Sequence, residues 1–235
     1  MPVAVAPRVV NRLIEGLPPG TRKKVLELCE PVNLVFGEVL CEANQRLRHV
    51  YFPLKGFISL VAMVEHHPPL EIGLVGNEGM VGATIALDVT GARLRGIVQG
   101  AGSALRMTAA QLRLQLRRNA AFRRTLNHYL FVLLAQQSRS IACSRFHEIK
   151  SRLARWLLMT HDRAHADHFH LTHQYLADML GVQRSAVTIA AGVLQKKKVI
   201  RYVRGEIIVL DRPALEAASC ECYRAVIEDH QRQFA

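Results

Sequence analysis

Between Leu171 and Ile200 the sequence gathers side chains that can contact nucleic acid. Arg184 carries a planar guanidinium, which is always charged and offers several hydrogen-bond donors in a fixed geometry. Three polar residues lie within about one helical turn of it: Gln183, Ser185 and Thr188. The run Lys196–Lys198 adds positive charge that attracts phosphates. No convincing Ser-His-Asp or Cys-His arrangement accompanies them, so we expect a protein that is not an enzyme.

Two short helices joined at a glycine are expected to hold these side chains. Apolar residues recur at helical spacing on both sides of Gly181: Leu176, Met179, Leu180, Val187, Ala190, Val193 and Leu194. Gly181 suits the positive φ of a helix end, and the small Ala177 lets the helices approach. Thr172 is an expected N-cap for the first helix, whereas Gln183 is a poor one for the second. The spacing predicts a helix-turn-helix.

A β-hairpin is predicted directly after these helices. Val199–Val203 and Glu206–Leu210 are extended runs joined at Arg204-Gly205. Together with the preceding helices, this hairpin makes a winged helix-turn-helix, a more specific pattern than either part alone.

The positive charge of the chain is unevenly distributed. The formal net charge is +12, yet residues 1–103 are almost neutral. Residues 104–144 contain seven arginines and no acidic residue, and residues 145–205 contain 11 basic and four acidic residues. An excess concentrated around a helix-turn-helix favours a polyanionic partner over general solubility.

The cysteines and histidines form no pattern from which we predict a metal site. The five cysteines are an odd number without a framework spacing, which fits a reducing compartment. Cys220 and Cys222 could ligate a metal or sense redox, but one pair cannot complete a tetrahedral site. Helical spacing favours one buried and one exposed thiol there. Five histidines crowd one segment, where we favour a solvated connector over a metal site: His161, His165, His168, His170 and His173.

Neither targeting nor membrane insertion is predicted. The first residues lack the charged and apolar regions of a signal peptide, and the longest apolar run, Tyr129–Ala135, is too short to span a bilayer. We therefore expect a cytoplasmic protein without a membrane partner.

The earlier part of the chain is predicted to change from strands to helices. After short helices in residues 8–30, short apolar runs alternate with glycine and proline turns from Pro31 to about Met107, which is typical of a β-roll, jelly roll or barrel. A short helix over about 108–116 and a long one over about 119–144 follow.

The long helix has more apolar surface than one contact face requires. A regular stripe continues into polar positions, and we predict that it forms a dimer interface: Phe122, Leu126, Tyr129, Leu133, Gln136 and Ser140. A neighbouring stripe contains Leu130, Leu134 and Ile141. The alternative is a helix buried within one protomer.

The order of short helices, β-roll, long helix and winged helix-turn-helix resembles the Crp/Fnr superfamily of bacterial transcription regulators. The likeness is strongest over Leu171–Leu210, and Gly37-Glu38 and Tyr51–Gly56 look like the family's early roll strands. The resemblance implies an α+β fold with a double-stranded β-roll of the cyclic-nucleotide-binding type. It places an effector-sensing domain with N-terminal helices in residues 1–118, a dimerisation helix in 119–145 and a winged helix-turn-helix with a C-terminal helix in 146–235.

The resemblance also assigns DNA-binding positions. Arg184 matches an arginine that reads guanine, and Thr172 matches a threonine that contacts phosphate. Further expected contacts are His173, Gln174, Gln183, Ser185, Thr188, Lys196, Arg201 and Arg204. Ser185 stands where cyclic-AMP-responsive members have a glutamate, and Ile189 stands where they have a second arginine, so the operator sequence should differ.

The expected effector pocket departs further from the family pattern. The positions that match its phosphate cassette are Gly79, Met80, Val81, Gly82, Arg93 and Arg95. Met80 replaces a glutamate that binds ribose, and Leu94 aligns with the phosphate-binding arginine. We expect weak or no cyclic-nucleotide binding of the family's usual kind, although a one-residue shift would restore Arg95.

These features predict a homodimer on a palindromic double-stranded DNA operator, with an unidentified small-molecule effector and no cofactor. RNA polymerase is an expected partner if the protein is an activator. The alternative is a small-molecule or metal sensor that acts through protein contacts and has a vestigial DNA-binding domain. Arg184 and Lys196–Lys198 argue against that alternative.

Overall fold

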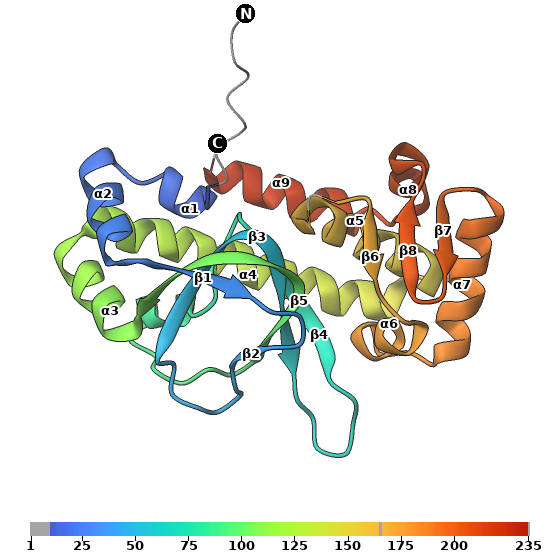
Figure 1. Cartoon of the computed structure of the whole chain (residues 1–235), viewed down its shortest axis with the longest axis horizontal. Coiled ribbons are helices and arrows are strands. Elements are labelled where there is room, and N and C mark those ends of the chain that lie inside the picture. Colours follow the sequence, from blue (N-terminus) through green and yellow to red (C-terminus); the bar gives the residue numbers. More distant parts are fainter. Residues whose placement is uncertain (1–9, 165, 235) are drawn as a thin grey trace, which may run out of the picture.

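The computed structural model describes residues 10–164 and 166–234. An N-terminal β-roll with flanking helices is joined by a long helix to a C-terminal helical domain that contains a small sheet (Figure 1). The combination of helices with antiparallel sheets confirms the predicted α+β class. No helix in the described part of the chain has the length and hydropathy needed to cross a membrane.

The roll is one antiparallel sheet in the order β1-β5-β3-β4, with β2 also paired to β5. Its strands are β1 (Glu30–Leu34), β2 (Val39–Cys41), β3 (His49–Ala62), β4 (Leu70–Val75) and β5 (Arg95–Thr108). The pairing of β3 with β5 contains three register shifts between Pro53 and Ile58. Such bulges bend a pair of strands, and the sheet curls around its own buried side chains.

Two glycines allow β3 and β5 to approach closely at this bend. A Cβ on Gly56 would lie 2.2 Å from the carbonyl oxygen of Gly100, and one on Gly102 would lie 2.2 Å from that of Lys55. Gly56 also has a φ of +78°, which other residues rarely adopt. A larger residue at either glycine would therefore force the two strands apart.

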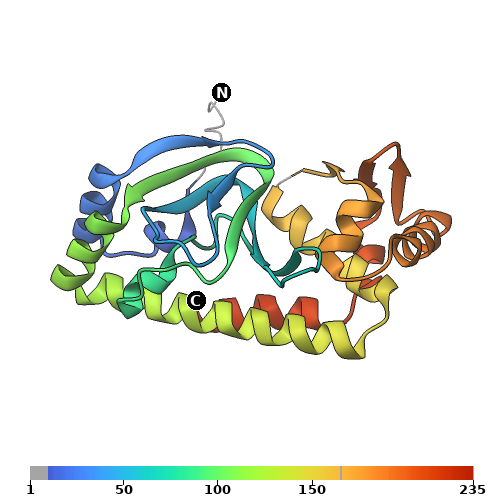
Figure 2. The ribbon, with the colours of Figure 1, turned by 90° about the horizontal axis from the view of Figure 1, so that it is seen from below.

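Helices enclose the roll on one side. They are α1 (Arg12–Glu15), α2 (Pro19–Leu28), the 3-10 helix η1 (Ala83–Leu87), α3 (Ala109–Arg118) and α4 (Ala120–Phe146). The side chain of Asn119 caps α4 by accepting a hydrogen bond of 3.0 Å from the Phe122 amide. Figure 2 shows α4 running below the roll and on to the C-terminal domain, so this one helix reaches both parts of the molecule.

The C-terminal domain contains α5 (Ile149–Ala164), α6 (His173–Leu180), α7 (Arg184–Lys196), α8 (Arg212–Ala218) and α9 (Cys222–Phe234). A three-stranded sheet in the order β6-β8-β7 accompanies them: β6 (His168–His170), β7 (Ile200–Val203) and β8 (Glu206–Val209). The prediction of a simple polar connector is therefore wrong for β6, which pairs with β8 and buries Phe169. The last helix, α9, returns along α4 (Figure 2).

A shared apolar core connects the roll to the C-terminal domain. Phe57 and Leu74 of the roll belong to the same buried cluster as Leu153 and Leu157 of α5 and Leu176 of α6. Movement of either part would disturb this common core, which is a physical route for coupling between them.

Candidate functional site

The α6–α7 unit has the geometry that the sequence predicts. Thr172 Oγ1 accepts a hydrogen bond of 3.1 Å from the Tyr175 amide, which caps α6. Gly181 ends this helix with a φ of +63°, and the Val182 amide donates to the carbonyl oxygen of Ala177 over 3.0 Å. Ala177 and Val187 are fully buried between the helices. These contacts hold α7 firmly on α6.

The outer face of α7 is exposed and carries the predicted base-reading residues. The exposed side chains here include Gln183, just before the helix, and Arg184, Ser185, Thr188, Ile189 and Lys196 within it. Within residues 10–164 and 166–234, no ion pair engages Arg184. Its guanidinium is thus available to a partner, and the large apolar Ile189 beside it is 69 % exposed.

His173, another predicted DNA contact, is half-buried between α7 and the wing. Its Nδ1 lies 3.0 Å from Thr188 Oγ1, and its ring stacks on Tyr202 with centroids 4.0 Å apart. Burial and the nearby charge of Arg184 lower the pKa of His173, which favours the neutral ring. His173 therefore links α6, α7 and the wing, and it positions Thr188.

The wing presents two of the predicted cations. Arg201 of β7 and Arg204 of the turn are exposed. Arg204 and Gly205 have φ values of +50° and +88°, the two positive values of a type I′ hairpin turn. This turn projects Arg204 at the tip of the hairpin. Near the start of α6, Gln174 is exposed and donates a hydrogen bond of 2.8 Å to Asp178.

The predicted dimer stripe on α4 is corrected by the structure. Phe122, Leu126 and Tyr129 are buried against the roll, where they belong to its apolar core. Gln136 is also buried, and its Oε1 accepts a hydrogen bond of 3.0 Å from the Leu74 amide. These four side chains contact their own protomer, so they are not available to a second one. Leu133 and Ser140, the other two predicted positions, are half-buried.

Another stripe of α4 is exposed in the described part of the chain. Phe131, Leu134 and Ile141 are 56 %, 62 % and 68 % exposed. With Asn127, Ser138 and Arg145, which are also exposed, they follow alternating spacings of four and three residues. This is the spacing of a two-stranded coiled-coil seam. The sequence placed Leu134 and Ile141 on the neighbouring stripe, but it did not reveal which stripe the roll would cover.

The six predicted effector positions have different surroundings in the described structure. Met80 is buried in the roll core, and Val81 pairs with Tyr51. The side chain of Arg95 forms an ion pair of 2.9 Å with Glu42, and Arg93 donates to Asn44 over 3.4 Å. Gly79 lies against the ring of Tyr129, and Gly82 lies against Val50. The two arginines thus have polar partners within the roll.

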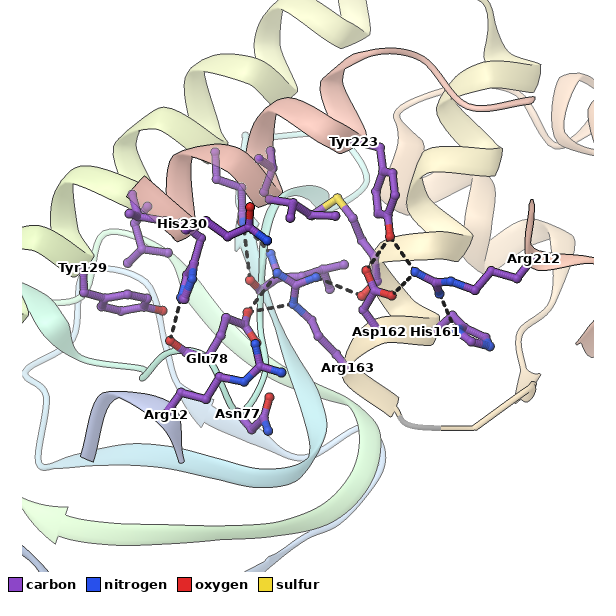
Figure 3. Close-up of a pocket in the computed structure, with 18 residues that line it drawn as sticks. Arg12, Asn77, Glu78, Tyr129, His161, Asp162, Arg163, Arg212, Tyr223 and His230 are labelled. Carbon is purple, nitrogen blue, oxygen red and sulfur yellow. Dashed lines mark hydrogen bonds and ion pairs between the residues drawn. The ribbon is translucent and has the colours of Figure 1, made fainter. Parts of the chain in front are cut away.

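A cavity of about 490 Å³ opens instead where the roll, α4, α5 and α9 meet (Figure 3). Its polar lining comes from Arg12, Asn77, Glu78, Gln136, His161, Asp162, Arg163, Arg212, Tyr223, His230 and Gln231. Asn77 and Glu78 immediately precede the predicted cassette, which itself contributes no lining residue. The cavity was missed because its walls come from segments up to 219 residues apart, from Arg12 to Gln231.

Two ion pairs organise this cavity. Arg163 and Glu78, with side chains only 9 % and 16 % exposed, form an ion pair of 2.8 Å. Burial opposes ionisation of Glu78, but Arg163 and backbone donors outweigh it, and the pKa of Glu78 is lowered. Arg212 pairs with Asp162 over 2.7 Å and donates to Tyr223. Arg12 adds a third arginine to a lining with two carboxylates, so the charged lining is net positive and the cavity suits a small polar anion.

A buried carboxyl group connects the roll to α5. Glu71 of β4 accepts hydrogen bonds from Trp156 Nε1 over 2.7 Å and from Ser59 Oγ over 2.5 Å. Burial raises the pKa of Glu71 to about 7, although these donors and two nearby arginines favour ionisation. The contribution of this group to stability is therefore largest below its unfolded pKa and is lost as the pH rises towards 7.

Replacing Glu71→Gln should stabilise the protein at about pH 8 and much less at about pH 5. The amide retains an acceptor for Trp156 but cannot ionise, and the difference should be at most about 3 kcal/mol. Thermal unfolding at the two pH values measures this effect. The exposed Glu65→Gln is the matched control. An equal shift of the Tm of Glu71→Gln at both pH values would contradict the raised pKa.

The structure brings the Cys220 and Cys222 pair together with two residues far away in the sequence. The Sγ atoms of Cys143, Cys220 and Cys222 and a ring nitrogen of His147 all lie within 4.8 Å of one another. The sequence favoured one exposed thiol in the pair, but both are buried, because the turn before α9 points them at the end of α4. Residues 143 and 147 are so far in the sequence from residues 220 and 222 that no sequence pattern predicts their proximity.

The histidines between positions 161 and 173 have separate surroundings in the described part of the chain. His161 lies 2.8 Å from Asp167, His170 lies 2.8 Å from Glu206, and His173 faces Thr188. His168 is an exposed residue of β6, and His165 lies outside the described residues. His161, His170 and His173 thus each contact a different residue.

The comparisons with known proteins agree with this architecture. Residues 151–218 match a family model described as the Crp-like helix-turn-helix domain. A Crp/Fnr-family transcriptional regulator from Eubacterium rectale is 14 % identical with a TM-score of 0.69, over 88 % of this chain and 96 % of the other. The search of curated proteins found no significant match.

Two further solved structures have the same fold. The c-di-GMP-responsive global regulator CLP of Xanthomonas campestris is 15 % identical with a TM-score of 0.66, over 82 % of this chain and 99 % of that protein. A Crp/Fnr-family regulator from Thermus thermophilus is 22 % identical with a TM-score of 0.63, over 81 % of this chain and 98 % of that protein. The chain therefore carries a Crp-like helix-turn-helix domain at residues 151–218 and has the fold of the Crp/Fnr-family transcription regulators.

Proposed function

We propose that this protein is a homodimeric regulator that binds a palindromic DNA operator in a sequence-specific manner. The observation that carries the proposal is the exposed face of α7, where Arg184 is free of ion pairs to the described residues on a firmly packed helix. A recognition helix of this kind enters the major groove, where an arginine reads guanine through two hydrogen bonds. The exposed wing cations lie on the same domain and supply phosphate contacts.

The exposed stripe on α4 supports the dimer. Phe131, Leu134 and Ile141 have the spacing of a coiled-coil seam, and a second copy of α4 would bury them. A two-fold dimer presents two recognition helices to half-sites about one helical turn apart, which requires an inverted repeat in the DNA. The dimer and the palindromic operator are thus parts of one proposal.

The wing is expected to contribute affinity without sequence preference. Replacing both Arg201→Ala and Arg204→Ala should weaken binding to all DNA sequences by a similar factor. Because each protomer then lacks two cations that face phosphates, the slope of log affinity against log salt should fall by up to about 4 for a dimer. Fluorescence anisotropy with labelled duplexes at several salt concentrations measures this slope. An unchanged slope would mean that the wing does not contact phosphates.

We further propose that an effector binds in the cavity between the roll, α4, α5 and α9, which we call the junction cavity. This proposal is supported by its polar, cationic lining and by its walls, which come from the roll, α4, α5 and α9 together. A ligand there contacts both parts of the molecule and can bias their relative position. A panel of small anionic metabolites, added to the same anisotropy measurement, tests this. A metabolite that acts as the effector should alter the affinity for the operator. If no metabolite of the panel changes this affinity, the proposal that an effector binds in this cavity is contradicted.

A further inference from the structure

We propose that Cys143, His147, Cys220 and Cys222 bind one zinc ion, which fastens the start of α9 to the end of α4. Cys143 lies in the last turn of α4, and His147 directly follows that helix. Cys220 and Cys222 flank the turn between α8 and α9. Three thiols and one imidazole are a common ligand set of structural zinc sites.

The distances fit a single tetrahedral ion. Cys143 Sγ lies 3.5 Å from Cys220 Sγ, and Cys222 Sγ lies 3.6 Å from His147 Nδ1. Zinc bonds of about 2.3 Å to sulfur and about 2.0 Å to nitrogen place neighbouring ligands roughly 3.5–3.8 Å apart. The four ligand atoms lie within 4.8 Å of one another, so a small contraction completes the site.

The surroundings orient the histidine in the way that a metal ligand requires. His147 Nε2 lies 3.0 Å from Glu221 Oε1, which leaves Nδ1 directed at the sulfur atoms. A carboxylate that holds the second ring nitrogen fixes the tautomer and strengthens the imidazole as a ligand. Glu221 lies between the two cysteines in the sequence, so the same turn supplies two ligands and this support.

The local charge also suits a thiolate-rich site. Zinc with three thiolates and a neutral imidazole carries a net charge of about −1. Arg155 of α5 is buried and donates a hydrogen bond of 3.1 Å to Ser140, about one turn before Cys143 in α4. Its Nε is buried and has no hydrogen-bond partner within the described residues. A negatively charged metal centre would give this guanidinium a compensating charge.

The geometry favours a mononuclear ion over the two other forms of cysteine chemistry. A disulfide has an S–S bond of about 2.05 Å and would use only two of the four converging groups. An iron–sulfur cluster distributes its ligands over several iron atoms and needs a wider cage than this compact group. The remaining cysteines, Cys29 and Cys41, lie in the roll part of the chain and provide matched controls.

The position of the site gives it a structural consequence. Tyr223, directly after Cys222, lines the junction cavity together with Val226 and His230 of α9. A metal that anchors the first residue of α9 would hold this wall of the cavity against α4. Loss of the metal should therefore loosen α9 and this wall of the cavity. The zinc proposal itself does not require that the cavity binds an effector.

Metal analysis of the full-length protein, purified under reducing conditions, tests the proposal. We expect about one zinc per protomer. Cobalt substitution should give the visible bands of a tetrahedral ion and a thiolate-to-metal charge-transfer band. Cys143→Ser and Cys220→Ser should each weaken zinc binding at least about 100-fold in competition with a chelator, whereas Cys29→Ser should retain it. Glu221→Gln preserves all four ligands and should weaken binding about 10-fold or more.

Several results would overturn the proposal. One is that the natural protein takes up neither zinc nor cobalt in tetrahedral geometry. Another is that Cys220→Ser binds zinc as tightly as the natural protein does. Bound iron with inorganic sulfide would also reject it. Mass spectrometry showing a Cys143–Cys220 disulfide in protein that takes up no metal would assign the cluster to thiol oxidation instead. If a cysteine variant fails to fold, the zinc content of the natural protein and the zinc affinity of Glu221→Gln still decide the test. DNA binding is measured separately, so either proposal can fail alone.

Discussion

Replacing Arg184→Ala should abolish the preference of this protein for its operator while leaving weak binding to unrelated DNA. Arg184 is exposed at the start of α7, on the outer face of a helix held by buried Ala177 and Val187. A bidentate arginine–guanine contact contributes about 1–3 kcal/mol, and a dimer has two such contacts. The expected loss of operator affinity is therefore at least about 30-fold.

The control for this variant removes the same charge elsewhere. Arg118 is exposed at the end of α3, away from α7 and the wing. Arg118→Ala should lower operator and unrelated affinities slightly and equally, through the change in net charge. The ratio of the two affinities, measured by competition at fixed salt, separates base reading from general attraction. If Arg184→Ala keeps the natural ratio, Arg184 does not read a base.

Introducing Phe131→Glu, Leu134→Glu and Ile141→Glu together should convert the protein into a folded monomer. All three side chains are exposed on α4, so the substitutions disturb no contact inside the protomer core. Burial of such a side chain at an interface is worth about 1.5–3 kcal/mol, and the new carboxylates would repel their counterparts. The dissociation constant of the dimer should rise by at least about 1,000-fold. Sedimentation velocity over a range of concentrations measures this change.

Two comparisons make the dimer test specific. Leu87→Glu places one carboxylate on another exposed apolar residue, 59 % exposed on η1, and should leave the dimer intact. Leu126→Glu should instead lower the Tm, because Leu126 is fully buried against the roll. If the triple variant on α4 remains dimeric, the interface lies on another surface.

The helix-turn-helix could be predicted from sequence because its determinants are local. Thr172, Ala177, Gly181 and Val187 act within 16 residues, through a cap, a close approach, a left-handed turn and a buried side chain. The wing could also be predicted from the sequence, since Arg204-Gly205 indicates a tight hairpin turn. Contacts between nearby residues leave a signal in residue types and spacing.

The faces of α4 could not be assigned from sequence alone. Its middle is apolar on more than one side, and both Leu126 and Leu134 belong to regular stripes. Which stripe the roll covers depends on how the sheet curls above the helix. The structure shows Leu126 under the roll and Leu134 exposed, so most of the predicted stripe packs within the protomer, whereas Leu134 and Ile141 of the neighbouring stripe stay exposed.

The cavity and the cysteine cluster depend on the path of the last helix. The return of α9 along α4 brings Cys220 and Cys222 to Cys143 and places His230 near Glu78. A pair such as Cys143 and Cys220 is 77 residues apart and leaves no periodic signal. Tertiary packing decides such contacts, and only a three-dimensional structure reveals them.

Selection of binding sites from random double-stranded DNA by the full-length protein tests the central claim most directly. We expect enrichment of an inverted repeat whose half-sites are centred about one helical turn apart, each with a guanine that Arg184 can read. Because Ser185 and Ile189 alter the rest of the reading surface, the other half-site positions should be distinct. Sequencing that finds no enriched motif after successive rounds would contradict the proposal that this protein is a sequence-specific regulator.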